Sequence, residues 1–310
     1  TAPAWSGPRS RQTALRSLGG ASGGASGGAG IPLPVGPFCP FHSDFFSSEA
    51  LADYSPELQA LDARLAQIMA KVQSGQALTP EEEEEACSKM RQANDRWLVT
   101  NTRMRYAEDF QAVETFYMMD ALLRREDLSM DAIEALMRWQ PASMKAQMSG
   151  QLPPPLPPGL TVDMLRRLEG KVMPSVMALN SVEVQAQPFV DDARGLGSAV
   201  VQEELEALMR DHRGMVDIGK GYRNFDPRGK ESFLDQMESI HDRWKVFFGR
   251  AKLMGEINPE FVRESEAYLR KAGLTVDEFH GILDEAHRLM RANAERDGLQ
   301  GASAAAGQGR

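Results

Sequence analysis

The apolar residues of the C-terminal third recur at helical spacing. Phe233, Met237, Ile240, Trp244 and Phe247 follow one another at steps of 4, 3, 4 and 3 residues. Because 3.6 residues complete a turn, this spacing places all five on one helical face. The rest of the chain shows no run of alternating apolar and polar residues that would indicate a strand. The pattern predicts an all-α protein, with helices near 56–73, 80–107, 110–126, 130–140, 197–217, 227–252, 259–271 and 276–296.

Capping signals support these helix starts. Thr79-Pro80-Glu81-Glu82 offers a hydroxyl for the N-cap, a proline for the first helical position and a glutamate for a capping box. Asp226-Pro227 and Asn258-Pro259 repeat the arrangement of cap and proline. A further amphipathic segment at 161–179 is interrupted by Pro174. The short connections between the predicted helices favour antiparallel neighbours.

Two parts of the sequence repeat each other. Asp95-Arg96-Trp97 returns 147 residues later as Asp242-Arg243-Trp244, and Leu128-Ser-Met-Asp131 returns as Leu274-Thr-Val-Asp277. Such a collinear series at a nearly constant offset indicates a tandem duplication of one helical unit. The first copy has the thinner apolar stripe, so we expect it either to have the smaller core or to rely on packing against its neighbour. Its stripe consists of Ala86, Met90, Ala93, Trp97 and Thr100.

Composition divides the chain around these two units. Residues 1–43 contain no Asp or Glu, are rich in Gly, Ala and Ser, and are predicted to be a disordered, transit-peptide-like remnant and linker. Helical unit 1 is expected at 44–148 and helical unit 2 at 189–297. Between them, 149–188 is predicted to be a linker with a short helix, because five prolines fall within 151–159. Residues 298–310 are expected to form a disordered tail.

Charge and composition exclude several classes of protein. The chain of 310 residues is 42% hydrophobic and has a net charge of −9. Its acidic character argues against nucleic acid as a partner, because phosphate backbones require clustered cations. No apolar run approaches the roughly 20 residues that a membrane-spanning helix needs. Two cysteines, Cys39 and Cys87, cannot form a disulfide framework or a four-cysteine zinc site.

The segment Gly221-Tyr-Arg-Asn-Phe-Asp-Pro-Arg-Gly-Lys230 and the helix pattern after it resemble a small family of helical proteins. This is family eighteen twenty-five of the domains of unknown function, found in cyanobacteria and plastids. The resemblance covers 189–296 well and 45–140 faintly. It implies a helical unit of about a hundred residues and a plastid location, but no reaction and no catalytic residues. The first unit has lost the loop and carries Leu78-Thr-Pro-Glu-Glu-Glu83 instead.

The same loop contains the one compact group of basic and aromatic residues in the sequence. Its cations could dock a carboxylate, a phosphate or an acidic partner protein. The alternative is an anchored turn whose aromatic residue packs on the next helix and whose charges are solvated. The candidate binding residues are Tyr222, Arg223, Phe225, Asp226, Arg228 and Lys230.

Two other motifs resemble sites of chemistry. Glu238 and His241, like Asp284 and His287, stand three residues apart, which is the spacing of metal ligands in helical bundles. A site for two metal ions would also need inward carboxylates from other helices, so we expect these histidines at the surface or at the core boundary, with no metal and no cofactor. The glycines from Gly214 to Gly221 imitate a phosphate-binding loop but lack the preceding strand, so they predict a helix cap and a turn.

The sequence therefore favours a non-enzymatic interaction or assembly module. We expect it in the plastid, in the stroma or peripherally on a thylakoid surface, in contact with a protein partner and associated with a photosynthetic complex. The alternative is a helical enzyme that binds a metal or a small ligand through Glu238 and His241.

Overall fold

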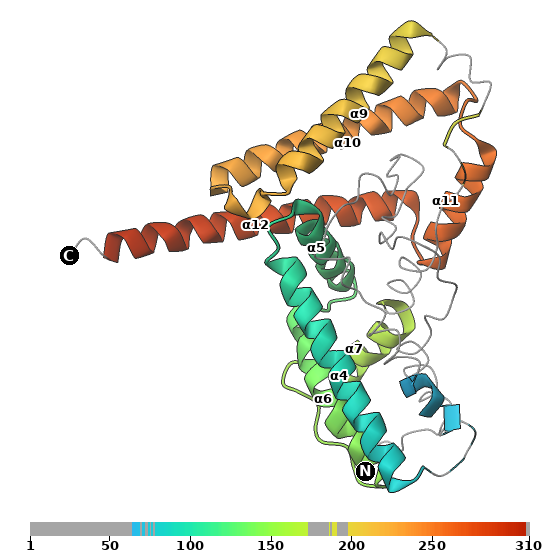
Figure 1. Ribbon diagram of the computed structural model, residues 1–310, viewed down its shortest axis with the longest axis vertical. Helices are drawn as coiled ribbons and strands as arrows, with labels where there is room; N and C mark the ends of the chain where they lie inside the picture. Colours follow the sequence, from blue (N-terminus) through green and yellow to red (C-terminus); the bar gives the residue numbers. More distant parts are fainter. Residues whose placement is uncertain are drawn as a thin grey trace. The chain divides into compact units, whose positions relative to one another are not determined.

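The computed structural model describes residues 64–172 except 69, 72, 73, 75 and 77, together with 186, 188–190 and 198–307. The fold is all-α, as predicted (Figure 1). Within the described residues, the strand-like structure is limited to an isolated antiparallel bridge between Phe189 and Ile257. Residues 64–68, 70 and 71 are helical and lie within the predicted helix 56–73. The helices that follow are α4 (Pro80–Arg105), α5 (Phe110–Arg124), α6 (Met130–Met148), α7 (Val162–Arg167), the π-helix η2 (Leu168–Val172), α9 (Ala199–Gly219), the 3₁₀ turn η3 (Tyr222–Asn224), α10 (Pro227–Leu253), α11 (Pro259–Lys271) and α12 (Val276–Gly307).

The predicted helix starts are confirmed by side-chain caps. Thr79 and Glu82 exchange two hydrogen bonds, of 3.2 and 3.3 Å, and form the expected capping box of α4. Thr275 and Glu278 form the same box at α12. Two predicted helix ends were wrong. α6 continues through the buried Pro141 because Ser143 and Met144 extend its buried face. α12 continues to Gly307, into the predicted tail, through alanines of high helix propensity.

The chain forms two compact units whose boundaries fall inside α4 and α5. Among the described residues, the first unit contains 64–102 and 122–172, and the second contains 103–121 together with the residues from 186 onward. The predicted units, 44–148 and 189–297, do not have this boundary. The reason is Phe110 of α5, whose ring contacts those of Tyr222 and Phe233 in the second unit. The predictions for 1–43 and 308–310 concern residues outside the described part.

The first unit has a core of small and flexible side chains. Asn94 of α4 is buried and its amide donates to the carbonyl of Met137 on α6 at 2.7 Å. The predicted stripe of α4 is only partly covered, since Ala93, Trp97 and Thr100 remain half-exposed. One apolar cluster of this unit consists of Leu65, Ile68, Ala86, Cys87, Met90 and Met144. The thinner stripe therefore buries less apolar area, as the sequence indicated.

The proline-rich segment after α6 accepts hydrogen bonds from the side chain of Trp139. Residues 151–157 have no regular secondary structure. The indole N–H of Trp139 donates to the carbonyl of Pro155 at 2.9 Å, while Leu152 is almost fully exposed. Prolines cannot donate backbone hydrogen bonds, so a carbonyl acceptor is the attachment that this segment offers. α7 follows it, and the predicted helix beyond 172 lies outside the described residues.

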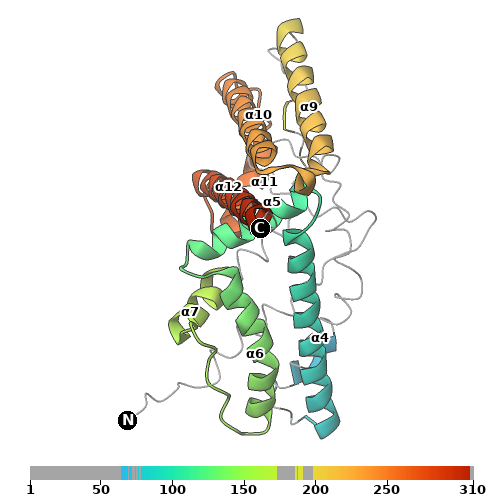
Figure 2. The ribbon, with the colours of Figure 1, turned by 90° about the vertical axis from the view of Figure 1, so that its left-hand side faces the viewer.

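In the second unit, α10 packs against both α9 and α12 (Figures 1 and 2). The predicted apolar face of α10 is confirmed, because all five of its stripe residues are buried. Trp244, at the centre, is fully buried and lies within 6 Å, between ring centroids, of Phe247 and Phe248. Burying each of these side chains contributes about 1.5–3 kcal/mol.

Glycines serve two different purposes in this unit. Gly255 and Gly273 follow the C-cap residues of α10 and α11 with positive φ of 72° and 67°, where a side chain would be strained. Gly219 was expected to act as a cap, but it is the last residue of α9 and has no positive φ. A Cβ there would stand 3.0 Å from both Phe110 and Phe233, so this glycine permits close packing instead.

Candidate functional site

The predicted loop is a short, well-anchored connection between α9 and α10. It consists of η3 and the turn into α10, where Asp226 Oδ1 accepts a hydrogen bond from the amide of Gly229 at 2.6 Å. Asp226 is therefore the N-cap of α10. Tyr222 is buried and its ring packs on Phe110, Phe225 and Phe233. Burial raises the pKa of the Tyr222 hydroxyl above its usual value.

The cations of the loop differ in their surroundings. Lys230 is largely covered and donates to Asp297 of α12 at 3.2 Å. Arg223 is exposed, and its guanidinium donates to the carbonyl of Tyr106 and lies 5.6 Å from the Tyr106 ring centroid. Arg228 is exposed and forms no ion pair with a described residue. The anchored-turn interpretation therefore explains Tyr222, Phe225 and Asp226. Lys230 is paired, whereas Arg223 and Arg228 have no carboxylate partner among the described residues.

Two of these cations line a pocket of about 390 Å³. Its walls come from the end of α4, from α5, from η3 and the start of α10, and from α12. Tyr117 and Tyr222 are buried beneath it, and Val113 and Met290 add apolar surface. We call this cavity the tyrosine pocket, lined by Arg105, Tyr106, Ala107, Val113, Tyr117, Tyr222, Arg223, Lys230, Met290, Asn293, Arg296 and Asp297.

Two guanidiniums of the tyrosine pocket stack on the same exposed ring. Arg105 lies 5.5 Å from the ring centroid of Tyr106, and Arg223 lies 5.6 Å from it. Cation–π contacts of this kind contribute about 0.5–1 kcal/mol at exposed sites. They hold both cations beside the cavity without neutralising their charge.

The charge of the tyrosine pocket is unbalanced. Four cationic side chains line it against the single carboxylate of Asp297, which Lys230 already engages. Arg105, Arg223 and Arg296 form no ion pair with a carboxylate in the described part of the chain, and Arg296 donates to the carbonyl of Ala292. A pocket with this excess of positive charge, in a chain of net charge −9, can attract an anion.

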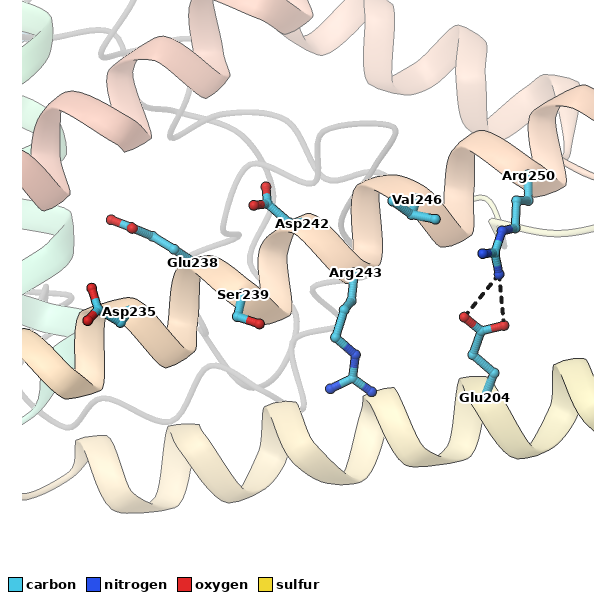
Figure 3. Close-up of a pocket in the computed structure, with 8 residues that line it drawn as sticks. All are labelled: Glu204, Asp235, Glu238, Ser239, Asp242, Arg243, Val246 and Arg250. Atoms are coloured by element: carbon cyan, nitrogen blue, oxygen red, sulfur yellow. Dashed lines mark hydrogen bonds and ion pairs between the residues drawn. The ribbon is translucent and has the colours of Figure 1, made fainter.

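In a second groove, between α9 and α10, the cationic side chains are paired with carboxylates (Figure 3). Arg250 reaches from α10 to α9 and contacts both carboxylate oxygens of Glu204 at 3.1 Å. Arg243 pairs in the same way with Asp211 of α9 at 2.8 Å. These cations connect the two helices and have their charges satisfied, so the groove offers a ligand little uncompensated charge.

A cluster of buried histidines lies beside the core of this unit. His287 of α12 is buried, and its Nε2 lies 2.7 Å from Glu114 of α5. Its other ring nitrogen lies 3.4 Å from Glu238, and its ring stacks on His241 at 5.9 Å between centroids. The prediction of surface or boundary histidines was wrong, because His241 and His287 are both buried. Sequence spacing missed the arrangement, since the partners come from separate helices.

The pKa values of the histidines in this cluster, which also includes His212 of α9 beside His241, are shifted in opposite directions. Burial lowers the pKa of His287, but the hydrogen bond and charge of Glu114, with the charge of Glu238, outweigh it and raise the pKa above its usual value. Burial lowers the pKa of His241 well below its usual value, and the nearby His287 adds to the effect. Burial alone lowers the pKa of His212 to about 4. The two carboxylates therefore favour the protonated form of His287, whereas burial favours the neutral forms of His241 and His212.

Replacing Glu114 with glutamine is expected to lower the pKa of His287, because the closest negative charge is removed while burial remains. We expect a loss of about 2 kcal/mol in stability, the typical effect of a hydrogen bond to a charged group. Titration of the histidine Cε1–H signals by NMR measures the shift. Glu285→Gln is the control, since Glu285 lies on α12 like His287 but pairs with Arg288, whose side chain is exposed. An unchanged His287 pKa in Glu114→Gln would contradict the assignment.

Glu238 and His241, the alternative metal ligands, have other roles. Glu238 pairs with Arg291 at 2.9 Å and lies near His287, and Arg291 also holds Asp235 at 2.8 Å. Among the described residues, no group of three or more His, Cys, Asp or Glu side chains is placed to hold a metal ion. Glu238 therefore pairs with Arg291 and lies near His287, whereas a metal site would require further carboxylates.

None of the described helices combines the length and apolar content that a membrane crossing requires.

Comparison with known proteins finds one family that resembles part of the chain. No curated protein and no solved structure matches the chain. Residues 195–294, which include α9, η3, α10, α11 and most of α12, match the family described as Domain of unknown function (DUF1825).

Proposed function

We propose that this protein is a non-enzymatic helical interaction module that binds an acidic segment of a partner protein at the tyrosine pocket. The observation that carries the proposal is the set of three arginines around this cavity that lack a carboxylate partner among the described residues. A guanidinium without a carboxylate partner gains charge-assisted hydrogen bonds when a carboxylate or a phosphate enters the pocket. Tyrosine and arginine are also the residue types that dominate protein interfaces.

The setting we propose is the plastid, in the stroma or at a thylakoid surface in association with a photosynthetic complex. Support comes from the resemblance of the loop 221–230 to a cyanobacterial and plastid family and from the acid-free composition of residues 1–43.

We also propose that the chain arose by tandem duplication. In both halves a long helix begins at a proline, a shorter helix follows, and a third helix begins after a capping Ser or Thr. Asn94 and His241 are equivalent positions in the repeat, and both are buried. Only the second copy keeps the cationic loop, and residues of the first copy, among them Arg105 and Tyr117, complete the pocket around it.

The test uses a variant in which Arg223, Arg228 and Lys230 are all changed to alanine. Proteins that co-purify with the wild-type chain from plastid extracts would first be identified by mass spectrometry. Binding of the purified partner is then measured by calorimetry, and we expect the triple variant to bind at least about tenfold more weakly, because interface arginines commonly contribute more than 1 kcal/mol each.

The matched control changes Lys252 and Lys271 to alanine. Both are exposed lysines in the last turns of α10 and α11, away from the tyrosine pocket. This control removes positive charge from the same unit and is expected to bind like the wild type. Equal affinity of the triple variant and the wild type would refute the proposed site.

A further inference from the structure

We propose that the group recognised in the tyrosine pocket is a phosphate monoester. This inference rests on the proposed function and narrows its ligand from acidic groups in general to a dianion. It draws on Arg105 and Arg296, which lie outside the loop that the sequence singled out.

The number of uncompensated cations favours a dianion over a carboxylate. Lys230 is paired with Asp297, which leaves the guanidiniums of Arg105, Arg223 and Arg296. A carboxylate would neutralise one of the three positive charges. A phosphate monoester near neutral pH carries close to two negative charges and three acceptor oxygens, so it can engage several guanidiniums at once.

The arrangement of the guanidiniums also suits a tetrahedral anion. Arg105 and Arg223 both lie against the ring of Tyr106 and approach the cavity from α4 and from η3. Arg296 and Asn293 both line the cavity from α12. Donors from three separate elements surround one space, whereas a planar carboxylate is best served by a single guanidinium fork.

The base of the pocket strengthens this attraction. Tyr117 and Tyr222 are buried, and Val113 and Met290 are apolar, so the cavity has a low-dielectric floor beneath its charged rim. Electrostatic attraction is stronger beside such a floor than in open solvent. The volume of about 390 Å³ lies at the small end of ligand sites and suits a phosphate with the short segment that carries it.

The phosphate could be carried by a phosphorylated serine or threonine of the partner or by a free small molecule. Both sources present the same group, and titrations of the purified full chain distinguish them. The probes are inorganic phosphate, glycerol phosphate, and one peptide in phosphoserine and unmodified forms. We expect saturable shifts of the Asn293 side-chain amide and arginine Nε–H signals in NMR spectra with every phosphate-containing probe. The unmodified peptide should bind at least tenfold more weakly than its phosphorylated form.

Arg105→Gln/Arg296→Gln is the diagnostic variant, because it removes two charges without touching the loop. We expect it to weaken phosphate binding at least tenfold. Arg243→Gln/Arg250→Gln is the control: it removes two arginines that already hold carboxylates on α9, and it should bind phosphate normally. Thermal unfolding of both variants checks that each is folded. If the diagnostic variant does not fold, the competition of sulfate for the wild-type site provides the same test.

The possible outcomes separate this inference from the proposed function. Tighter binding of the phosphopeptide than of glycerol phosphate assigns the phosphate to a protein, and the reverse order assigns it to a small molecule. Absence of saturable phosphate binding, or equal binding by the diagnostic variant, overturns the inference. If partner binding is then still lost in the Arg223, Arg228 and Lys230 variant, the interaction module stands without phosphate. If phosphate binds but no partner depends on these residues, the proposed function fails alone.

Discussion

Replacing Trp244 with alanine is expected to lower the free energy of unfolding of the second unit by about 4–5 kcal/mol. The cost combines the lost burial of a large side chain with the cavity that remains. Trp244 is fully buried among the rings of Phe247 and Phe248, and its indole N–H donates to Nδ1 of His212 at 3.1 Å. Hydrogen exchange of the amides of α9 and α10 measures the loss within this unit, independently of the other.

Two further variants separate the causes of this effect. Trp97 is the equivalent residue in the first unit and is half-exposed, so Trp97→Ala is expected to cost markedly less. Trp244→Phe retains most of the volume but removes the donor to His212, and we expect an intermediate loss of about 1–3 kcal/mol. Equal losses for Trp244→Ala and Trp97→Ala would contradict the assignment of the main core to α10.

Acidification is expected to destabilise the second unit through His212. Its pKa is about 4 in the folded protein because of burial, whereas an exposed histidine titrates near 6.5. Below about pH 6.5 the unfolded chain therefore binds a proton that the folded chain does not accept until about pH 4. Stability from this residue is complete above pH 6.5 and decreases by about 3 kcal/mol between pH 6.5 and pH 4. Denaturant unfolding at a series of pH values measures it.

Other titrating groups surround His212, so the difference between variant and wild type is the informative quantity. His241 of α10 faces it and has a lowered pKa of the same sign. His287 of α12 opposes the trend, because its pKa is raised and its contribution is lost as pH rises. His212→Asn keeps an acceptor for Trp244 without a titrating ring, so we expect a shallower loss of stability in acid. An identical pH profile would show that His212 does not carry the effect.

Much of the fold could be predicted from the sequence because its signals are local. The capping boxes at Thr79 and Thr275 and the stripe of α10 depend on residues three or four positions apart, and a helix brings these together wherever it lies. The cationic loop was recognised for the same reason. The helix ends near Pro141 and Gly298 were misplaced. Burial of Ser143 and Met144 extends α6 beyond Pro141, and the helix-favouring alanines after Gly298 extend α12 to Gly307.

The sequence by itself determined that the protein is helical, where its main helices begin, and which loop carries unusual charge. Tertiary structure alone decided that Arg105, Tyr106 and Arg296 join that loop around one pocket. It also decided that His287 meets Glu114, 173 residues away in the chain. The physical reason is the separation along the chain of the residues that must come into contact. Helix formation follows from contacts within a turn, whereas burial, pKa shifts and uncompensated charge depend on which distant side chains packing brings together.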